Sequence, residues 1–129
     1  MVKNLETFKS ENGSLFALNK IEEFTPRRMF YVTDVQKGES RGFHAHKRDK
    51  QLLVCVKGKI SVTLDNGASP SEFLLREGQS VFMDTLIWGV QKYLTGEDIL
   101  LVLCSEEHDE SEYIKSYFQF LKTLKEKRK

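Results

Sequence analysis

Short apolar runs separated by turn residues fill the chain from about residue 14 to residue 105, a pattern typical of an all-β domain. The runs lie at 15–18, 28–32, 52–56, 60–64, 72–75, 80–83 and 99–104. The run 52–56 is apolar at every position, which predicts a central strand covered on both faces. The run 60–64 alternates apolar with polar residues, which predicts a strand with one exposed face. We therefore expect about eight or nine strands.

The hydrophobic period changes near the C-terminus. Apolar residues recur there at steps of three and four, as on one face of an amphipathic helix: Tyr113, Ile114, Tyr117, Phe118, Leu121 and Leu124. Residues 109–112 (Asp-Glu-Ser-Glu) offer a cap and a capping-box partner, so the predicted helix spans about 110–126. The pattern predicts a single domain over 1–129, a small barrel or jelly roll at about 14–105 with a C-terminal helix.

Composition narrows the class of protein only a little. The chain has 129 residues and a formal net charge of +1, which gives no reason to expect a nucleic acid or a membrane surface as partner. The polar N-terminal residues lack the apolar core of a secretory leader. Cys55 and Cys104 lie in strand-like runs, so we expect two buried thiols and a cytoplasmic protein.

Two of the three histidines stand two residues apart, at His44 and His46. On an extended segment this spacing points both imidazoles to the same side. The wider pattern G-x5-H-x-H-x4-Q-x6-G, from Gly38 to Gly58, matches the first motif of the cupin superfamily, with Gln51 in place of its acidic ligand. The second cupin motif, laid from residue 78, places Gly89 where a histidine is usual.

Loss of two of the four usual ligands makes a poor metal cage. We therefore predict no metal at this site, and a pair of imidazoles that moves protons near neutral pH. Two satisfied core histidines in a decayed cupin are the plain alternative. The cations Arg41 and Lys47 on either side of the pair favour an anionic ligand instead.

The residues around the histidines closely resemble the dTDP-sugar 3,4-ketoisomerases. The resemblance rests on five segments, in order along nearly the whole chain: 12–15 (NGSL), 41–47 (RGFHAHK), 51–58 (QLLVCVKG), 99–106 (ILLVLCSE) and 109–114 (DESEYI). It implies an RmlC-like cupin jelly roll that acts without metal on dTDP-4-keto-6-deoxy-D-glucose, in deoxysugar biosynthesis for a glycan such as an O-antigen, S-layer or lipooligosaccharide. It further implies a homodimer with exchanged N-terminal strands, and His44 and His46 as the catalytic pair.

The chain departs from the family pattern at three positions. Asn12 stands where the family often has Arg, which bears on a phosphate or base contact. Gly89 follows Trp88 where the family often has His, and His108 replaces a common aromatic residue.

The implied reaction suits histidine chemistry. Moving a keto group from C4 to C3 needs a base for the C3 proton and an acid for C4, through an enediol(ate), and imidazole has a suitable pKa. We favour His44 as the carbon base and His46 as the shuttle between the two oxygens. No cofactor is expected, because the chain has no glycine-rich dinucleotide motif.

Several further residues are candidates for holding the substrate. Arg41 or Tyr31 would stabilise the enolate, with the Tyr31 hydroxyl in the lumen, and Arg28 and Arg41 would bind the diphosphate. Trp88 or a tyrosine would stack on thymine. Gln51 and Lys47 complete the predicted substrate-binding set. The plain alternatives are a surface charge for Arg28 and a barrel-core position for Trp88.

Three other functions compete with the isomerase. A 3,5-epimerase-like cupin would need a His–Asp pair, and no Asp stands beside these histidines in sequence. A non-catalytic sugar- or nucleotide-binding cupin would bind without turnover. Gln51 and Gly89 disfavour a metal-dependent oxygenase. The sequence leaves open the C4 configuration of the product and the division of roles between the two histidines.

Overall fold

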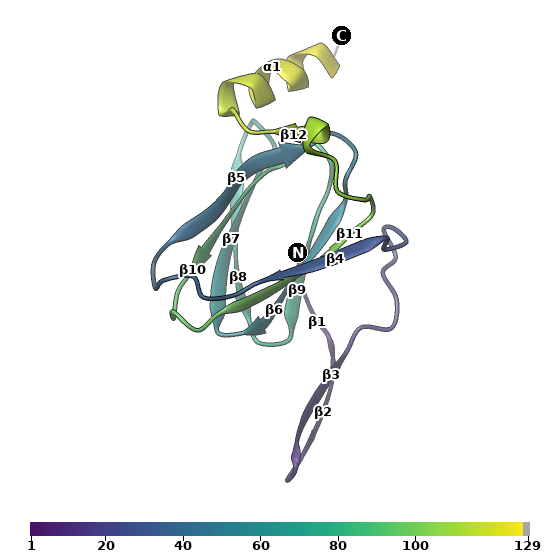
Figure 1. Ribbon diagram of the computed structural model, residues 1–129, viewed down its shortest axis with the longest axis vertical. Coiled ribbons are helices and arrows are strands. Elements are labelled where there is room, and N and C mark those ends of the chain that lie inside the picture. The colour runs from purple at the N-terminus through teal and green to yellow at the C-terminus, as the bar shows by residue number, and fades with distance from the viewer. Residues whose placement is uncertain (128–129) are drawn as a thin grey trace.

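The computed structural model describes residues 1–127 and forms a β barrel with a helix across one end and a hairpin projecting from the other (Figure 1). One sheet has the order β1-β9-β6-β11-β4 and the other the order β12-β5-β10-β7-β8. Their strands are β1 (Val2–Asn4), β4 (Arg28–Val32), β5 (Ser40–His46), β6 (Gln51–Lys57), β7 (Lys59–Asp65), β8 (Pro70–Arg76), β9 (Gln79–Met83), β10 (Trp88–Tyr93), β11 (Ile99–Cys104) and β12 (Tyr113–Ile114). The hairpin consists of β2 (Glu6–Ser10) and β3 (Gly13–Ala17).

The core of the protein fills the space between the two sheets. Its fully buried members come from both sheets and include Leu53, Val81, Leu100 and Val102 on the first and Ile60 and Val62 on the second. Residues 52–55 of β6 are all buried, which confirms the prediction of a central strand. A second cluster lies between the second sheet and the C-terminal helix.

All seven predicted strand runs form strands, but the predicted limits of the barrel need correction. The run 15–18 overlaps β3, which pairs only with β2 and therefore lies outside the barrel. In its place β1 pairs with β9, so the barrel begins at Val2 and not near residue 14. The prediction missed β10, whose Trp-Gly-Val-Gln-Lys-Tyr sequence lacks an apolar run.

The prediction of a helix from about residue 110 was wrong at its start. The helix α1 spans Tyr117–Lys127. The Asp109 side chain does cap a turn, but that turn is a single 3-10 turn at Glu110–Glu112. The next two residues form β12, which pairs with the end of β5, so tertiary pairing overrides the helical period there. This pairing brings residues 112 and 113 to the histidines.

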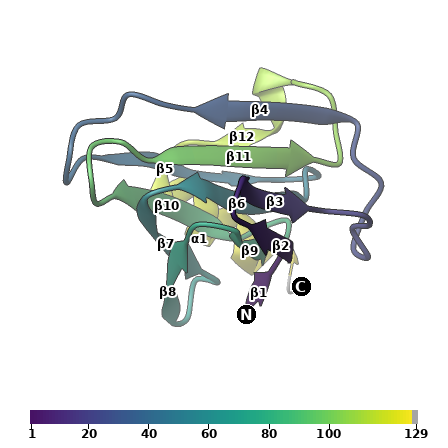
Figure 2. The ribbon, with the colours of Figure 1, turned by 90° about the horizontal axis from the view of Figure 1, so that it is seen from below.

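The hairpin β2–β3 stands away from the barrel, on the side opposite α1 (Figures 1 and 2). Its large apolar side chains Phe8 and Leu15 are 59% and 58% exposed. Its base is anchored where the Phe16 ring lies against the turn at Gly78.

The two cysteines are buried and unpaired, as predicted, and burial raises the pKa of both the Cys55 and the Cys104 thiol to about 12. Among the described residues no helix is long and apolar enough to cross a membrane.

Candidate active site

A β-bulge in β5 brings the arginine and the histidines of the motif to the same face. Residues 89 and 90 of β10 pair with His44 and Gly42, so Phe43 is the extra residue of β5. Gly42 and Phe43 both have positive φ, 100° and 58°. Residues three apart on a regular strand point to opposite faces, but one extra residue reverses the parity. Arg41 and His44 therefore both border the interior cavity.

The two histidines lie side by side under one tyrosine ring. The ring centroids of His44 and His46 are 4.8 Å apart. The Tyr113 ring stacks on His44 at 5.1 Å and meets His46 edge-on at 4.6 Å. The prediction that both imidazoles converge on one small volume is confirmed, while the contact with Tyr113 was not predicted.

A buried carboxylate holds one of the two imidazoles. His46 is fully buried, and its Nδ1 lies 2.9 Å from Oε1 of Glu112, which is also buried. The other carboxylate oxygen, Oε2, accepts the backbone N–H groups of Arg48 at 2.8 Å and Asp49 at 3.0 Å. The opposite ring nitrogen, His46 Nε2, is buried without a hydrogen-bond partner among residues 1–127. This nitrogen therefore has no protein group among these residues that would compete with a ligand.

The surroundings of His44 favour its neutral form. Burial lowers its pKa, and the neighbouring His46 and Lys115 act in the same direction, against the opposing effects of the Gly42 backbone and Glu110. A neutral imidazole at neutral pH has a lone pair ready to accept a proton. His44 thus meets the first requirement for a general base.

The cavity beside His44 has a volume of about 100 Å³ and a mixed lining. Its polar members come from three strands and are Arg41, His44, Gln51, Gln91 and Tyr93. The Tyr93 hydroxyl is buried without a partner among the described residues, and burial raises its pKa to about 12, so it stays a donor. Sequence reasoning missed Tyr93 and Gln91 because it missed their strand.

The glycine at the position of a usual cupin histidine lies next to His44. Gly89 is the cross-strand partner of His44, which supports the alignment that placed it there. A Cβ atom at residue 89 would lie 2.8 Å from Sδ and Cε of Met83, so the Met83 side chain occupies the adjoining space. No side chain at this position is available to bind a metal.

The remaining acidic groups do not make a metal cage either. His46, Asp49 and Glu112 offer ligand atoms within 4.8 Å of one another. However, the carboxylate oxygens of this group already accept hydrogen bonds. Those of Glu112 accept from His46, Arg48 and Asp49, as described above. Those of Asp49 accept from the Gln51 amide at 3.0 Å and from the Glu106 N–H at 3.1 Å. Gln51 thus acts as a hydrogen-bond donor within this network. The residues present do not fit a cupin metal centre.

The structure separates the predicted substrate-binding residues into two groups. Arg41 and Gln51 border the cavity, and Arg28 lies on the inward-facing side of β4, its guanidinium 4.8 Å from the Phe30 ring centroid. Lys47 is exposed beyond the end of β5, and its Nζ atom donates to the Ser111 carbonyl oxygen at 3.4 Å.

Tyr31 and Trp88 both lie outside the lumen, and the prediction that the Tyr31 hydroxyl points into the lumen was wrong. Tyr31 is 65% exposed on the outer face of β4, because its neighbours Phe30 and Val32 are the residues of this strand that face inward. Trp88 packs against Tyr117 and Phe120 of α1 in the second core cluster, which is the plain alternative named above.

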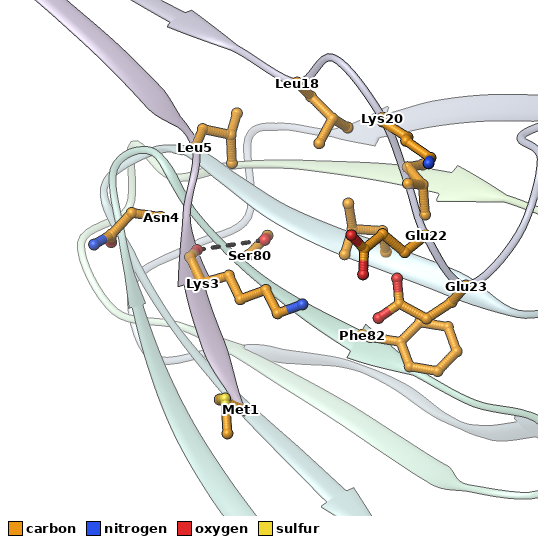
Figure 3. A pocket seen from close by; sticks show the side chains of 12 residues that line it. Met1, Lys3, Asn4, Leu5, Leu18, Lys20, Glu22, Glu23, Ser80 and Phe82 are labelled. Carbon is orange, nitrogen blue, oxygen red and sulfur yellow. Dashed lines mark hydrogen bonds between the residues drawn. The ribbon is translucent and has the colours of Figure 1, made fainter.

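A larger hollow lies on the outside of the barrel, away from the histidines (Figure 3). It has a volume of about 450 Å³ and lies between β1 and the segment 18–23, with Lys3, Leu18, Glu22 and Phe82 among its lining residues. None of the lumen residues contributes to it.

Comparison with known proteins identifies the family. The family model described as FdtA, WxcM-like, C-terminal, matches residues 1–125. The chain belongs to the FdtA family. A TDP-4-oxo-6-deoxy-α-D-glucose-3,4-oxoisomerase from Aneurinibacillus thermoaerophilus is 34% identical over 126 residues, which cover 95% of this chain and 91% of that protein.

Solved structures of FdtA-like enzymes share the fold. A 3,4-ketoisomerase from Helicobacter canadensis is 30% identical, with a TM-score of 0.89 and coverage of 97% of this chain and 96% of the other. QdtA, a sugar 3,4-ketoisomerase from Thermoanaerobacterium thermosaccharolyticum solved in complex with TDP, is 26% identical, with a TM-score of 0.89 and coverage of 98% and 95%. These likenesses confirm the predicted cupin barrel with its C-terminal helix and the family resemblance.

Proposed function

We infer that this protein is a TDP-sugar 3,4-ketoisomerase that moves the keto group of TDP-4-keto-6-deoxyglucose from C4 to C3. The observation that carries the inference is a pair of adjacent imidazoles, one of which borders the interior cavity, in a chain 34% identical to a TDP-4-oxo-6-deoxyglucose 3,4-oxoisomerase. The nucleotide part of the substrate follows from QdtA, which was solved with TDP bound.

The proposed reaction moves two protons and needs no net exchange with another molecule. His44, neutral and at the cavity wall, takes the proton from C3, and the electrons of that C–H bond form the enediolate. His46 takes the proton from the hydroxyl on C3 and returns it to the oxygen on C4. The proton on the His44 imidazole exchanges with water, and His44 then protonates C4, which leaves a ketone at C3.

Charge that develops on the enediolate needs fixed donors in a dry site. The Arg41 guanidinium and the Tyr93 hydroxyl both border the cavity, and the Tyr93 hydroxyl has no competing partner among the described residues. Arg28, on the inner face of β4, supplies a second cation for the diphosphate. We propose these three residues as the polar contacts of the substrate, with Gln51 and Gln91 beside them.

One observation favours a second candidate, a 3,5-epimerase-like reaction. The sequence offered no carboxylate beside the histidines, but the fold brings Glu112 to His46. A histidine with a carboxylate partner suits proton abstraction next to either side of a C4 ketone.

The experiment that separates these functions follows deuterium. The chelator-treated enzyme is incubated with TDP-4-keto-6-deoxyglucose in D₂O, and the sugar ring is followed by NMR. We expect a 3-keto product with deuterium at C4 and none at C5. Exchange at C5 would favour the epimerase, and bound but unchanged substrate would favour a non-catalytic binding protein.

We further propose that two copies form a dimer through the exposed apolar surface of the hairpin. Because β1 pairs within its own chain, the element available for exchange is β2–β3, whose Phe8 and Leu15 are both more than half exposed. Burial of two such side chains is worth about 3–6 kcal/mol. The Phe8→Ser/Leu15→Ser variant is therefore expected to weaken the dimer at least a hundredfold in sedimentation equilibrium.

The matched control for this variant is Phe118→Ser, on α1 at the opposite end of the barrel and 78% exposed. It is expected to leave the dimer intact. A wild-type protein that sediments as a monomer at micromolar concentration would refute the proposal.

The unpaired thiols of Cys55 and Cys104 support a reducing compartment, and we propose the cytoplasm.

A further inference from the structure

We propose that Glu112 is a positioning residue, which fixes the tautomer of His46 so that Nε2 carries the lone pair that meets the substrate. The proposal rests on the proposed function only for its kinetic consequence. Its structural part, the position of one proton, stands on the geometry of the site alone.

The donors around the Glu112 carboxylate determine where that proton lies. Oε2 accepts two backbone N–H groups, from Arg48 and Asp49, and backbone amides only donate. An ionised carboxylate is an acceptor at both oxygens, so Oε1 accepts from His46 Nδ1 across 2.9 Å. In a neutral imidazole with Nδ1–H, the other nitrogen, Nε2, has the free lone pair.

The burial of His46 and Glu112 strengthens the assignment of the imidazole proton to Nδ1. His46 is 0% exposed and Glu112 2% exposed, so water does not compete for either group. Nε2 is buried with no partner among residues 1–127, although a buried polar atom normally has one. A substrate hydroxyl would satisfy it, and the carboxylate would stabilise the imidazolium that forms when Nε2 takes a proton.

The carboxylate also holds the chain segment that follows the histidines. Glu112 lies on the 3-10 turn after β11, and its bonds to residues 48 and 49 join this turn to the loop after β5. The Lys47 N–H donates to the Glu112 carbonyl at 3.1 Å, which strengthens the same junction. One side chain therefore sets both the orientation of the ring and the loop beside it.

The Glu112→Gln variant is expected to change the tautomer of His46 in a defined direction. The amide oxygen must face the two backbone N–H groups, because an NH₂ group there would oppose two donors. The NH₂ group then faces Nδ1 and donates to it, which moves the imidazole proton to Nε2. The nitrogen that should accept the substrate proton is thereby blocked, as happens with the wrong tautomer in a Ser-His-Asp triad, where kcat falls about 10⁴-fold.

The decisive measurement is the ¹⁵N NMR spectrum of the imidazole nitrogens near pH 7.5. The chain has three histidines, and the His46→Asn variant identifies the signals of that ring. We expect Nδ1–H for His46 in the wild type and Nε2–H in Glu112→Gln. A wild-type ring protonated at Nε2, or at both nitrogens, would overturn the proposal, whether or not the variant folds.

The kinetic measurement links the tautomer to the reaction. Glu112→Gln is expected to lower kcat about 10²–10⁴-fold with KM changed less than fivefold. The matched control is Glu107→Gln, whose side chain is 80% exposed and should keep wild-type kcat. A folded Glu112→Gln enzyme with full kcat would overturn the positioning role. A wild type without turnover but with the Nδ1–H tautomer would instead refute the proposed function.

Discussion

The His44→Asn variant is expected to lose turnover by about 10²–10⁴-fold while its affinity for TDP changes no more than several-fold. His44 borders the interior cavity, and burial keeps its imidazole neutral, so its loss removes the proposed carbon base. Asparagine retains polarity but has no group that accepts a proton near neutral pH. The measurement is kcat by NMR of the sugar ring, with TDP affinity by calorimetry.

The control for this variant is the third histidine. His108→Asn changes a side chain that is 51% exposed and does not border the cavity, and it should keep wild-type kcat. Full activity of His44→Asn would contradict the base assignment. A raised KM with unchanged kcat would assign His44 to binding instead.

The Gly42→Ala variant is expected to lower both stability and kcat, because the bulge in β5 has no room for a methyl group. A Cβ there would lie 2.8 Å from the Gly89 carbonyl oxygen and 2.9 Å from Oε1 of Gln91. The positive φ of 100° adds a backbone cost of about 1–2 kcal/mol. A shift of about 1 Å in His44 or Arg41 is enough to lower kcat about 10²-fold.

Gly38→Ala separates the two causes. Gly38 has a similar φ of 87° but nothing within 4 Å of its Cβ position. Its variant should lose only the backbone cost in urea unfolding and keep kcat, whereas Gly42→Ala should lose about 1–3 kcal/mol more. Equal losses of stability and activity in the two variants would show that the close approach at residue 42 does not position the site.

Local patterns predicted seven of the strands, because most strands of this barrel alternate between lumen and outer face, although the bulge in β5 breaks this alternation. The seven apolar runs all form strands, and the uniformly apolar run at β6 is covered on both sides. The helix start failed because Tyr113 and Ile114 fit a helical period, yet pairing with β5 gives them a strand conformation. The hydrophobic period of the sequence carries no record of the partner strand, whose residues His46 and Ala45 lie 67 and 69 positions before Tyr113 and Ile114.

The histidine pair could be found from sequence because its two members share one strand. The supporting residues could not, because each reaches the site through tertiary structure. Glu112 resembled a capping residue, and only the fold brings it to His46, 66 positions earlier in the chain. Tyr31 was misplaced for a related reason: strand parity decides which side of the barrel it occupies, as the helix α1 does for Trp88.

The contact between Gly89 and Met83 bears on how this site can evolve. Any side chain at residue 89 must displace the Met83 thioether, which is 2% exposed and borders the interior cavity. The atoms in the way are the far end of a flexible side chain, so Met83 can shift toward that cavity to admit a small residue at 89. A larger residue at 89 also needs a smaller residue 83, so the two positions are coupled. A side chain as large as histidine is expected to fit at this position best when residue 83 is also made small. The Met83 thioether therefore links the residue at position 89 to the shape of the cavity beside His44.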